Sequence, residues 1–136
     1  MKTARSLVAL GAIVLLATAI IHATGYRELA KAIQASGVAP VLVSALKGLW
    51  LMLSIHLVVL GALLIVATTV ADGRRIIFMA GLIPLADTVL LFHFAGIFVG
   101  TIALGLATIF IFSGGLLWPE SAPRLGAAMV QKTRKP

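Results

Sequence analysis

The 136-residue chain contains no cysteine and few charged residues. The lack of cysteine excludes disulfides, thiolate metal ligands, thiol nucleophiles and cysteine-linked haem. Charged residues make up 11% of the chain, against about 25% in average soluble domains. No polar stretch is long enough to bury a core of its own, so a large aqueous domain is excluded as well.

Several catalytic signatures are also missing from the sequence. It has no HExxH, no GxSxG, no Walker phosphate-binding loop and no pair of carboxylates within its apolar stretches. These absences argue against a hydrolase, an ATP-driven pump and a carboxylate-clamped metal exchanger. We therefore assign no catalytic residues and leave enzymatic activity open.

What remains is strongly apolar: 61% of the residues are hydrophobic, and the mean hydropathy is +1.15. About 20 apolar residues suffice for a helix to cross a bilayer. The sequence therefore predicts one all-α membrane domain, an antiparallel up-down-up-down four-helix bundle. The predicted spans cover about 6–24, 41–71, 76–95 and 97–118, followed by a mobile basic tail over 119–136.

The connection over residues 26–39 has a helical pattern of its own. Good helix formers occur there, with Leu29 and Ile33 spaced i,i+4. We expect a short helix lying in the membrane interface. Gly37 should end this helix, and Pro40 suits the first turn of the next one.

The net charge of +7 indicates lipid rather than nucleic acid as the partner, because the basic residues flank the apolar spans. One set of flanks carries Lys2, Arg5, Arg74, Arg75, Arg124, Lys132, Arg134 and Lys135. The opposite set carries Arg27, Lys31 and Lys47. The positive-inside rule then predicts a multi-pass protein of the cytoplasmic (inner) membrane with both termini in the cytoplasm, and anionic lipid at its basic flanks.

One histidine lies in the outer part of each of the first three spans. Counted from the nearest charged residue on the cytoplasmic side, His22, His56 and His93 lie 17, 16 and 18 residues into their spans. That spread is about 3 Å of helical rise, so the three imidazoles are predicted at one level. Imidazole binds metals and carries protons, so a shared site for copper, zinc, haem or a small ligand is one interpretation. Three separate hydrogen bonds between helices are the alternative.

The helical faces predict an inward-facing His22 and place a thioether one turn from His56. His22 lies on a stripe of the first span whose small residues favour close packing. The stripe contains Gly11, Leu15, Thr18, His22 and Gly25. In the second span, one face contains Leu49, Met52, His56, Val59 and Leu63.

Asp87 is the only carboxylate within the four spans. An ionisable group there costs about 2.5–3.5 kcal/mol on insertion scales, so we expect it to face protein and to handle protons or a substrate. It lies about 240° around an ideal helix from His93, so the two should not share a face. The alternative is a structural hydrogen bond to Thr88, Thr18 or Thr101.

The fourth span carries small residues at helical spacing. They include Gly96, Gly100, Ala103 and Ala107, and the first two form a GxxxG pattern. Such a stripe lets helix backbones approach closely. We expect it to pack against another helix of this chain or of a second copy.

Three functions agree with these features of the sequence. The first is a small helix bundle with a His-lined polar site near the outer leaflet that binds a metal, haem or small ligand. The second is a dimeric transporter or channel with Asp87 in its pathway. The third is an accessory subunit without chemistry, packed onto a larger membrane complex by its small-residue faces.

Overall fold

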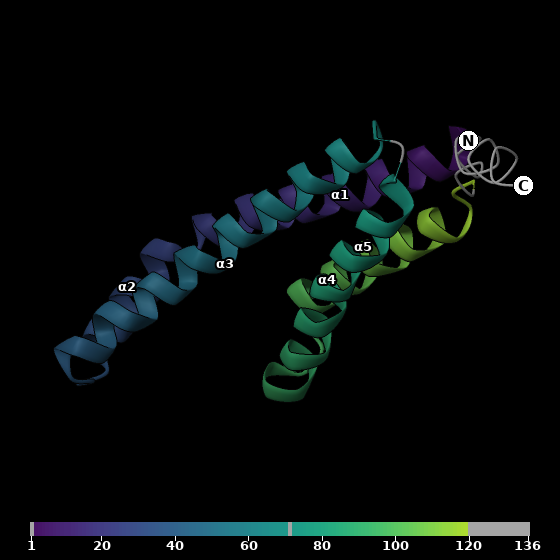
Figure 1. Cartoon of the computed structure of the whole chain (residues 1–136). Helices are drawn as coiled ribbons and strands as arrows, with labels where there is room; N and C mark the ends of the chain where they lie inside the picture. The colour runs from purple at the N-terminus through teal and green to yellow at the C-terminus, as the bar shows by residue number, and fades with distance from the viewer. Residues whose placement is uncertain (1, 71, 120–136) are drawn as a thin grey trace, which may run out of the picture.

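The computed structural model describes residues 2–70 and 72–119, which form five α-helices and no strand (Figure 1). The helices are α1 (Lys2–Thr24), α2 (Tyr26–Ala35), α3 (Pro40–Ala67), α4 (Gly73–Ala95) and α5 (Val99–Leu116). All except α2 are long and apolar enough to span a membrane. The predicted all-helical class with four membrane-length helices is confirmed. From residue 120 onwards, the predicted mobile tail lies outside the described residues.

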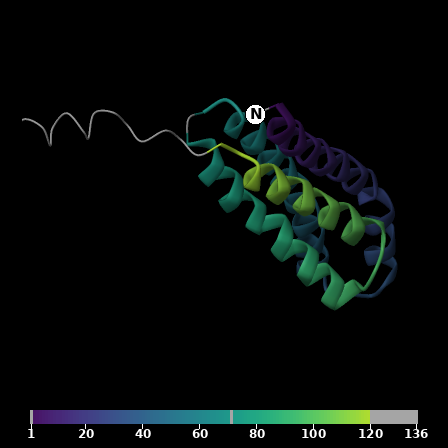
Figure 2. The same ribbon diagram turned by 90° about the vertical axis from the view of Figure 1, so that its right-hand side faces the viewer.

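Helix α1 packs along both α3 and α5, and α5 also packs along α4. The contact between α3 and α4 is the least extensive of these four. In Figure 1 the α1–α3 pair and the α4–α5 pair converge at the end that carries the N-terminus and diverge at the other end. In the view of Figure 2 the long helices lie side by side along a common direction. We call the line along which α3 and α4 meet the seam between these helices. The separation of the two helices increases away from the N-terminal end.

The ends of the helices follow the local sequence. Ser36 caps α2, and Gly37 adopts φ +70°, a left-handed conformation that glycine reaches without steric cost. Pro40 lies in the first turn of α3, as predicted. Gly25, between α1 and α2, keeps helical dihedral angles (φ −69°, ψ −11°), so α2 follows directly on α1. Helix α2 packs on α3 and buries Ile33.

Close approach between α1 and α5 depends on small residues. A Cβ atom added to Gly114 would lie 2.6 Å from Cγ2 of Val8 and 2.9 Å from the carbonyl oxygen of Ala4. A Cβ added to Gly11 would lie 2.6 Å from Cγ1 of Ile111. These distances leave no room for a side chain, so the two glycines set the spacing of the α1–α5 pair.

The predicted small-residue stripe of the fourth span is only partly correct. Ala107 is fully buried, and its carbonyl oxygen lies 3.2 Å from the Cβ position of Gly11. Ala103 is half-buried. Gly96, however, is the C-cap of α4 with φ +75°, and α5 begins only at Val99, so the GxxxG pattern does not lie on one helix. A Cβ on Gly100 would meet the ring of Phe98 rather than another helix, whereas Gly96 has open space around its Cβ position.

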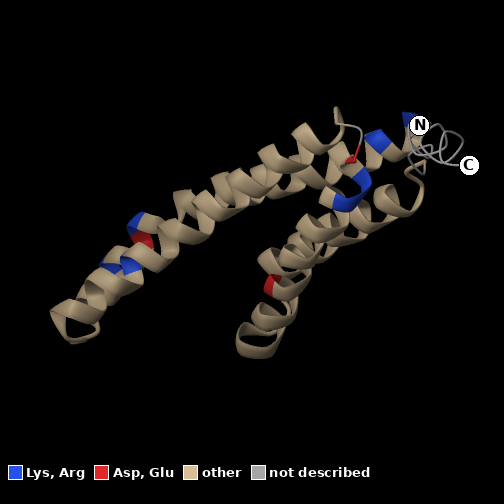
Figure 3. Cartoon of the chain, in the orientation of Figure 1, with Lys and Arg blue, Asp and Glu red and all other residues tan. Residues whose placement is uncertain are grey.

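Charged residues gather near the two ends of the long helices, and the sides are apolar (Figure 3). At the end with the N-terminus, the Arg5 guanidinium lies 6.0 Å from the centre of the Trp118 ring, a cation–π contact. The acidic position drawn within α4 in Figure 3 is Asp87, the only acidic residue of that helix. An ionisable group therefore stands apart from both charged ends, within an otherwise apolar span.

Candidate functional site

Asp87 of α4 lies opposite His56 of α3. The distance between His56 Nε2 and Asp87 Oδ2 is 3.4 Å, and 39% and 23% of the two side chains are exposed. This is an ion pair when the imidazole is protonated and a polar contact when it is not. It is longer than a charge-assisted hydrogen bond, which spans about 2.7–2.9 Å. The two side chains face each other, but no hydrogen bond joins Nε2 to Oδ2.

Helical spacing explains why Asp87 faces the protein. Ile77, Ala80 and Pro84 form a buried stripe of α4, and Asp87 continues it one turn beyond Pro84. Pro84 is fully buried, and the neighbouring Gly81 packs against Ile111 of α5. The stripe holds α4 against α5 and leaves Asp87 at the edge that meets α3.

Both polar atoms of the pair are buried, and neither has a hydrogen-bond partner among residues 2–70 and 72–119. The threonines proposed as partners of Asp87 are engaged elsewhere. Each donates to a carbonyl oxygen within its own local chain: Thr88 to Pro84 at 2.6 Å, Thr18 to Val14 at 2.7 Å and Thr101 to Gly96 at 3.0 Å. A hydroxyl has one proton to donate, so none of these three threonines donates to Asp87. The pair keeps unused donor and acceptor capacity.

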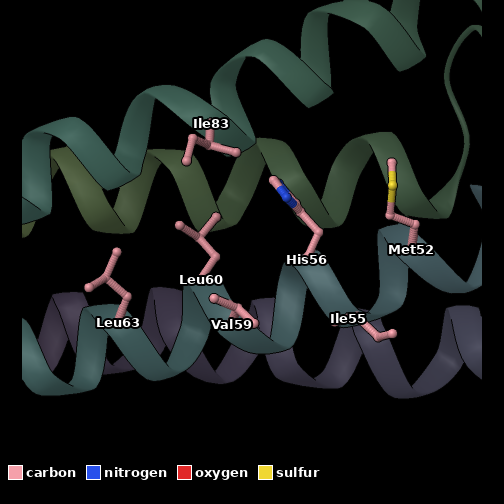
Figure 4. Close-up of a pocket in the computed structure, with 7 residues that line it drawn as sticks. All are labelled: Met52, Ile55, His56, Val59, Leu60, Leu63 and Ile83. Atoms are coloured by element: carbon pink, nitrogen blue, oxygen red, sulfur yellow. The ribbon is translucent and has the colours of Figure 1, made fainter.

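His56 also lines a groove along α3, with a volume of about 360 Å³ (Figure 4). Its other lining residues are Met52, Ile55, Val59, Leu60, Leu63 and Ile83. Apart from the imidazole, this lining is apolar. In Figure 4 the His56 ring points from α3 towards α4, on the side where Ile83 lies. Four of these residues belong to the helical face predicted from the sequence: Met52, His56, Val59 and Leu63.

His22 belongs to a different cluster, between α1 and α3. Its Nδ1 lies 2.9 Å from the Ser54 hydroxyl, and its ring stacks on Trp50 with centroids 3.9 Å apart. The indole N–H of Trp50 donates to the backbone carbonyl of His22 at 2.8 Å. His22 and Trp50 also line a cavity of about 270 Å³ formed by residues of all four long helices. The remaining lining residues are Thr18, Leu53, Leu57, Leu91, Ala95, Phe98, Gly100 and Leu104.

His93 joins neither cluster. It is exposed near the end of α4, with its ring edge-on to Phe94 at 4.8 Å. Asp87, which contacts His56, lies six residues earlier, or about 9 Å of rise. His56 is therefore level with Asp87 rather than with His93, which corrects the predicted common level. The count for His56 started from Asp72, but α3 ends at Ala67, so it included turn residues that add no helical rise.

The three histidines thus have three separate surroundings. No group of three or more His, Asp or Glu side chains that could hold a metal ion occurs in the described part of the chain. Sequence reasoning missed the His56–Asp87 pair and the partners of His22. A signal for the pair was present, since the second and third spans are consecutive and each carries one ionisable group near mid-span.

No protein-family model, no curated protein and no solved structure matches the chain. The four membrane-length helices define the class as a multi-pass membrane protein by length and composition.

Proposed function

We propose that this protein is a small four-helix bundle of the cytoplasmic membrane that binds a small membrane-soluble molecule at the His56–Asp87 pair. One observation carries the proposal. Two buried polar atoms face each other at 3.4 Å beside an apolar groove, and neither has a hydrogen-bond partner among the described residues. Unpartnered polar groups are costly in an apolar medium, so a site that keeps them is suited to a ligand or water that pairs with them.

The two halves of such a site have different tasks. The aliphatic side chains and Met52 of the groove would hold the apolar body of the molecule. The imidazole of His56, the one polar side chain of the lining, would fix its polar group, and Asp87 behind it would orient the imidazole. His22 and His93 lie outside this arrangement, since each contacts other residues.

A metal centre has less support. Catalytic zinc sites take three protein ligands and structural ones four, whereas the pair supplies two. Copper, zinc and haem remain hypotheses from the sequence, and absorbance with metal analysis of the purified protein tests them. A Soret band or stoichiometric metal would contradict the proposed apolar-ligand site.

Transport is the second candidate, favoured by the position of the pair within two spans. His56 and Asp87 can hold a proton between them, and ionisable groups in spans often belong to proton or substrate pathways. Proteoliposomes with a pH-sensitive dye inside test this candidate. Transport predicts proton flux on addition of substrate, and an Asp87→Asn variant that abolishes it.

The proposal includes an orientation and partners. Consecutive spans run antiparallel, both termini face the cytoplasm, and α2 lies on the outer side at the membrane interface. The excess of Lys and Arg on one set of flanks supports this arrangement. Anionic lipid would contact the basic flanks, and a second copy or a larger complex would cover part of the apolar sides.

Mass spectrometry of co-purified molecules tests the proposed binding function. The protein is purified in mild detergent and extracted with organic solvent. We expect one molecule in near-stoichiometric amount with wild type and with His93→Ala, and its loss from His56→Leu and Asp87→Leu. Equal retention by all four proteins would contradict the proposal.

A further inference from the structure

We propose that the cavity beside His22 and Trp50 is a second binding site, and that it takes a neutral aromatic molecule of one or two rings. No residue lines both this cavity and the groove at His56, so the two sites are separate. Binding here goes beyond the proposed function and does not depend on it. Three features point to this ligand class: the size and position of the cavity, the polar groups on its wall and the aromatic rings that line it.

The cavity lies between the two helix pairs. Residues of α1 and α3 form one side of its wall, and residues of α4 and α5 with the preceding Phe98 form the other. Apart from Leu57 near the middle of α3, they lie towards the end where the pairs diverge (Figure 1). Protein interiors keep few voids larger than a water molecule. This cavity measures about 270 Å³, whereas an apolar cavity of about 150 Å³ in another protein already admits benzene.

The polar groups on the cavity wall already have partners within the protein. His22 Nδ1 lies 2.9 Å from the Ser54 hydroxyl, and the Trp50 indole N–H donates to the His22 carbonyl. The Thr18 hydroxyl donates to the carbonyl of Val14. In the described part of the chain, no lining residue has a buried side-chain nitrogen or oxygen without a partner, and none is Asp, Glu, Lys or Arg. A charged or strongly polar ligand would lose its hydration here without replacement, so the cavity favours a neutral, apolar one.

Aromatic rings line the cavity from both helix pairs. The His22 ring stacks on Trp50 with an interplanar angle of 19°, and Phe98 faces the same cavity from the start of α5. A Cβ on Gly100 would lie 2.6 Å from the Phe98 ring, so glycine leaves the space that this ring occupies. Aromatic rings gain offset-stacked or edge-to-face contacts with one another beyond the burial of area.

A lipid acyl chain is the competing occupant of the cavity. The wall is short, with about 10 Å of rise on α3 from Trp50 to Leu57 and about 6 Å on α1 from Thr18 to His22. Four helices bound this short space, which suits a compact ring system more than an extended chain. An alkyl chain would also forgo the contacts between rings. We therefore assign the cavity to an aromatic molecule.

Fluorescence of Trp50 tests the inference in the full chain in mild detergent. The chain has two tryptophans, so a Trp118→Phe background leaves Trp50 as the single reporter. The probe is 1,4-dibromobenzene, whose bromine atoms quench an indole that they contact. We expect saturable quenching in this background, and the same quenching when His56→Leu and Asp87→Leu are added.

Two variants that fill the cavity should remove this quenching. Leu104→Phe puts a larger side chain at a buried position of the wall, and Ala95→Phe does so at an exposed position that is less demanding for folding. Each should weaken probe binding by at least about tenfold, because the space is then occupied. Leu106→Phe is the matched control, since it makes the same exchange at an exposed position of α5 outside the cavity, and it should bind like the parent.

Three results would overturn the inference. The first is quenching that does not saturate, or that persists unchanged in the filling variants; Ala95→Phe decides if Leu104→Phe does not fold. The second is quenching by phosphatidylcholine with brominated acyl chains, blocked by the filling variants, without quenching by dibromobenzene, which would assign the cavity to lipid. The third is loss of quenching when His56 and Asp87 are replaced, which would contradict a separate site. The molecule that co-purifies through the His56–Asp87 pair is measured independently, so each of the first two results leaves the proposed function intact.

Discussion

His56 and Asp87, 31 residues apart in sequence, bring an imidazole nitrogen and a carboxylate oxygen to 3.4 Å across the seam between α3 and α4. This seam is the least extensive of the four contacts between long helices. A polar pair therefore lies where the apolar packing is thinnest. Such a position costs stability unless the pair has a partner, which connects the fold to the proposed binding function.

The first prediction concerns the stability of the pair. His56→Leu alone leaves a carboxylate without its imidazole, and Asp87→Leu alone leaves the imidazole unpaired. We expect each to lower the free energy of unfolding by about 1–3 kcal/mol. The double variant should be close to wild type, because an apolar pair of similar volume needs no partner. Thermal or denaturant unfolding in mild detergent measures this, and a double variant as unstable as the sum of both single ones would contradict it.

The second prediction concerns the α1–α5 contact. Gly114→Ala places a Cβ 2.6 Å from Val8 and 2.9 Å from the carbonyl of Ala4. Overpacking of this kind costs about 1–3 kcal/mol. Gly105→Ala is the matched control on the same helix, because its Cβ would meet only Cγ2 of Thr88, at an ordinary 3.7 Å. The control should be neutral or stabilising by up to about 1 kcal/mol. Equal stability of the two variants would show that Gly114 does not set the spacing.

The third prediction separates the His22 cluster from the His56–Asp87 site. Trp50→Phe keeps an aromatic ring beside His22 but removes the indole N–H that donates to the His22 carbonyl. We expect a loss of about 1 kcal/mol in stability and no change in the amount of co-purified molecule. His93→Ala, at an exposed position, should change stability by less than about 0.5 kcal/mol. Loss of the bound molecule in Trp50→Phe would instead point to one site that spans both clusters.

The fourth prediction concerns orientation in the membrane. The positive-inside rule predicts a cytoplasmic C-terminus and places Gln34 of α2 on the outer side. Reporter fusions after Gln34 and at the C-terminus should therefore report opposite sides. A fusion at Thr69, next to the turn between α3 and α4, should report the same side as the C-terminus. Activity of all three on one side would contradict the proposed topology.

Much of the fold was predictable from the sequence. Long apolar runs specify membrane-length helices with little ambiguity, and Gly37 and Pro40 mark the boundaries of α2 and α3 through simple backbone preferences. The face of α3 that includes Met52, His56 and Val59 also follows from helical periodicity. These features are local, so they need no knowledge of how helices pack.

The errors arose where helices end. Counting from Asp72 assumed that the second span is helical up to that residue, but α3 ends at Ala67, so His56 lies level with Asp87 and not with His93. The GxxxG pattern assumed that Gly96 continues into the fourth span, whereas its φ of +75° ends α4 there. Apolar spacing alone reveals neither the residue at which α3 ends nor the break at Gly96.

The most direct test of the central claim is a double-mutant cycle on the amount of co-purified molecule per protein. If His56 and Asp87 act as one polar site, then His56→Leu, Asp87→Leu and the double variant should each lose the bound molecule to the same extent, while His93→Ala retains it. Losses that add independently, or full retention by the double variant, would contradict a single binding site at this pair.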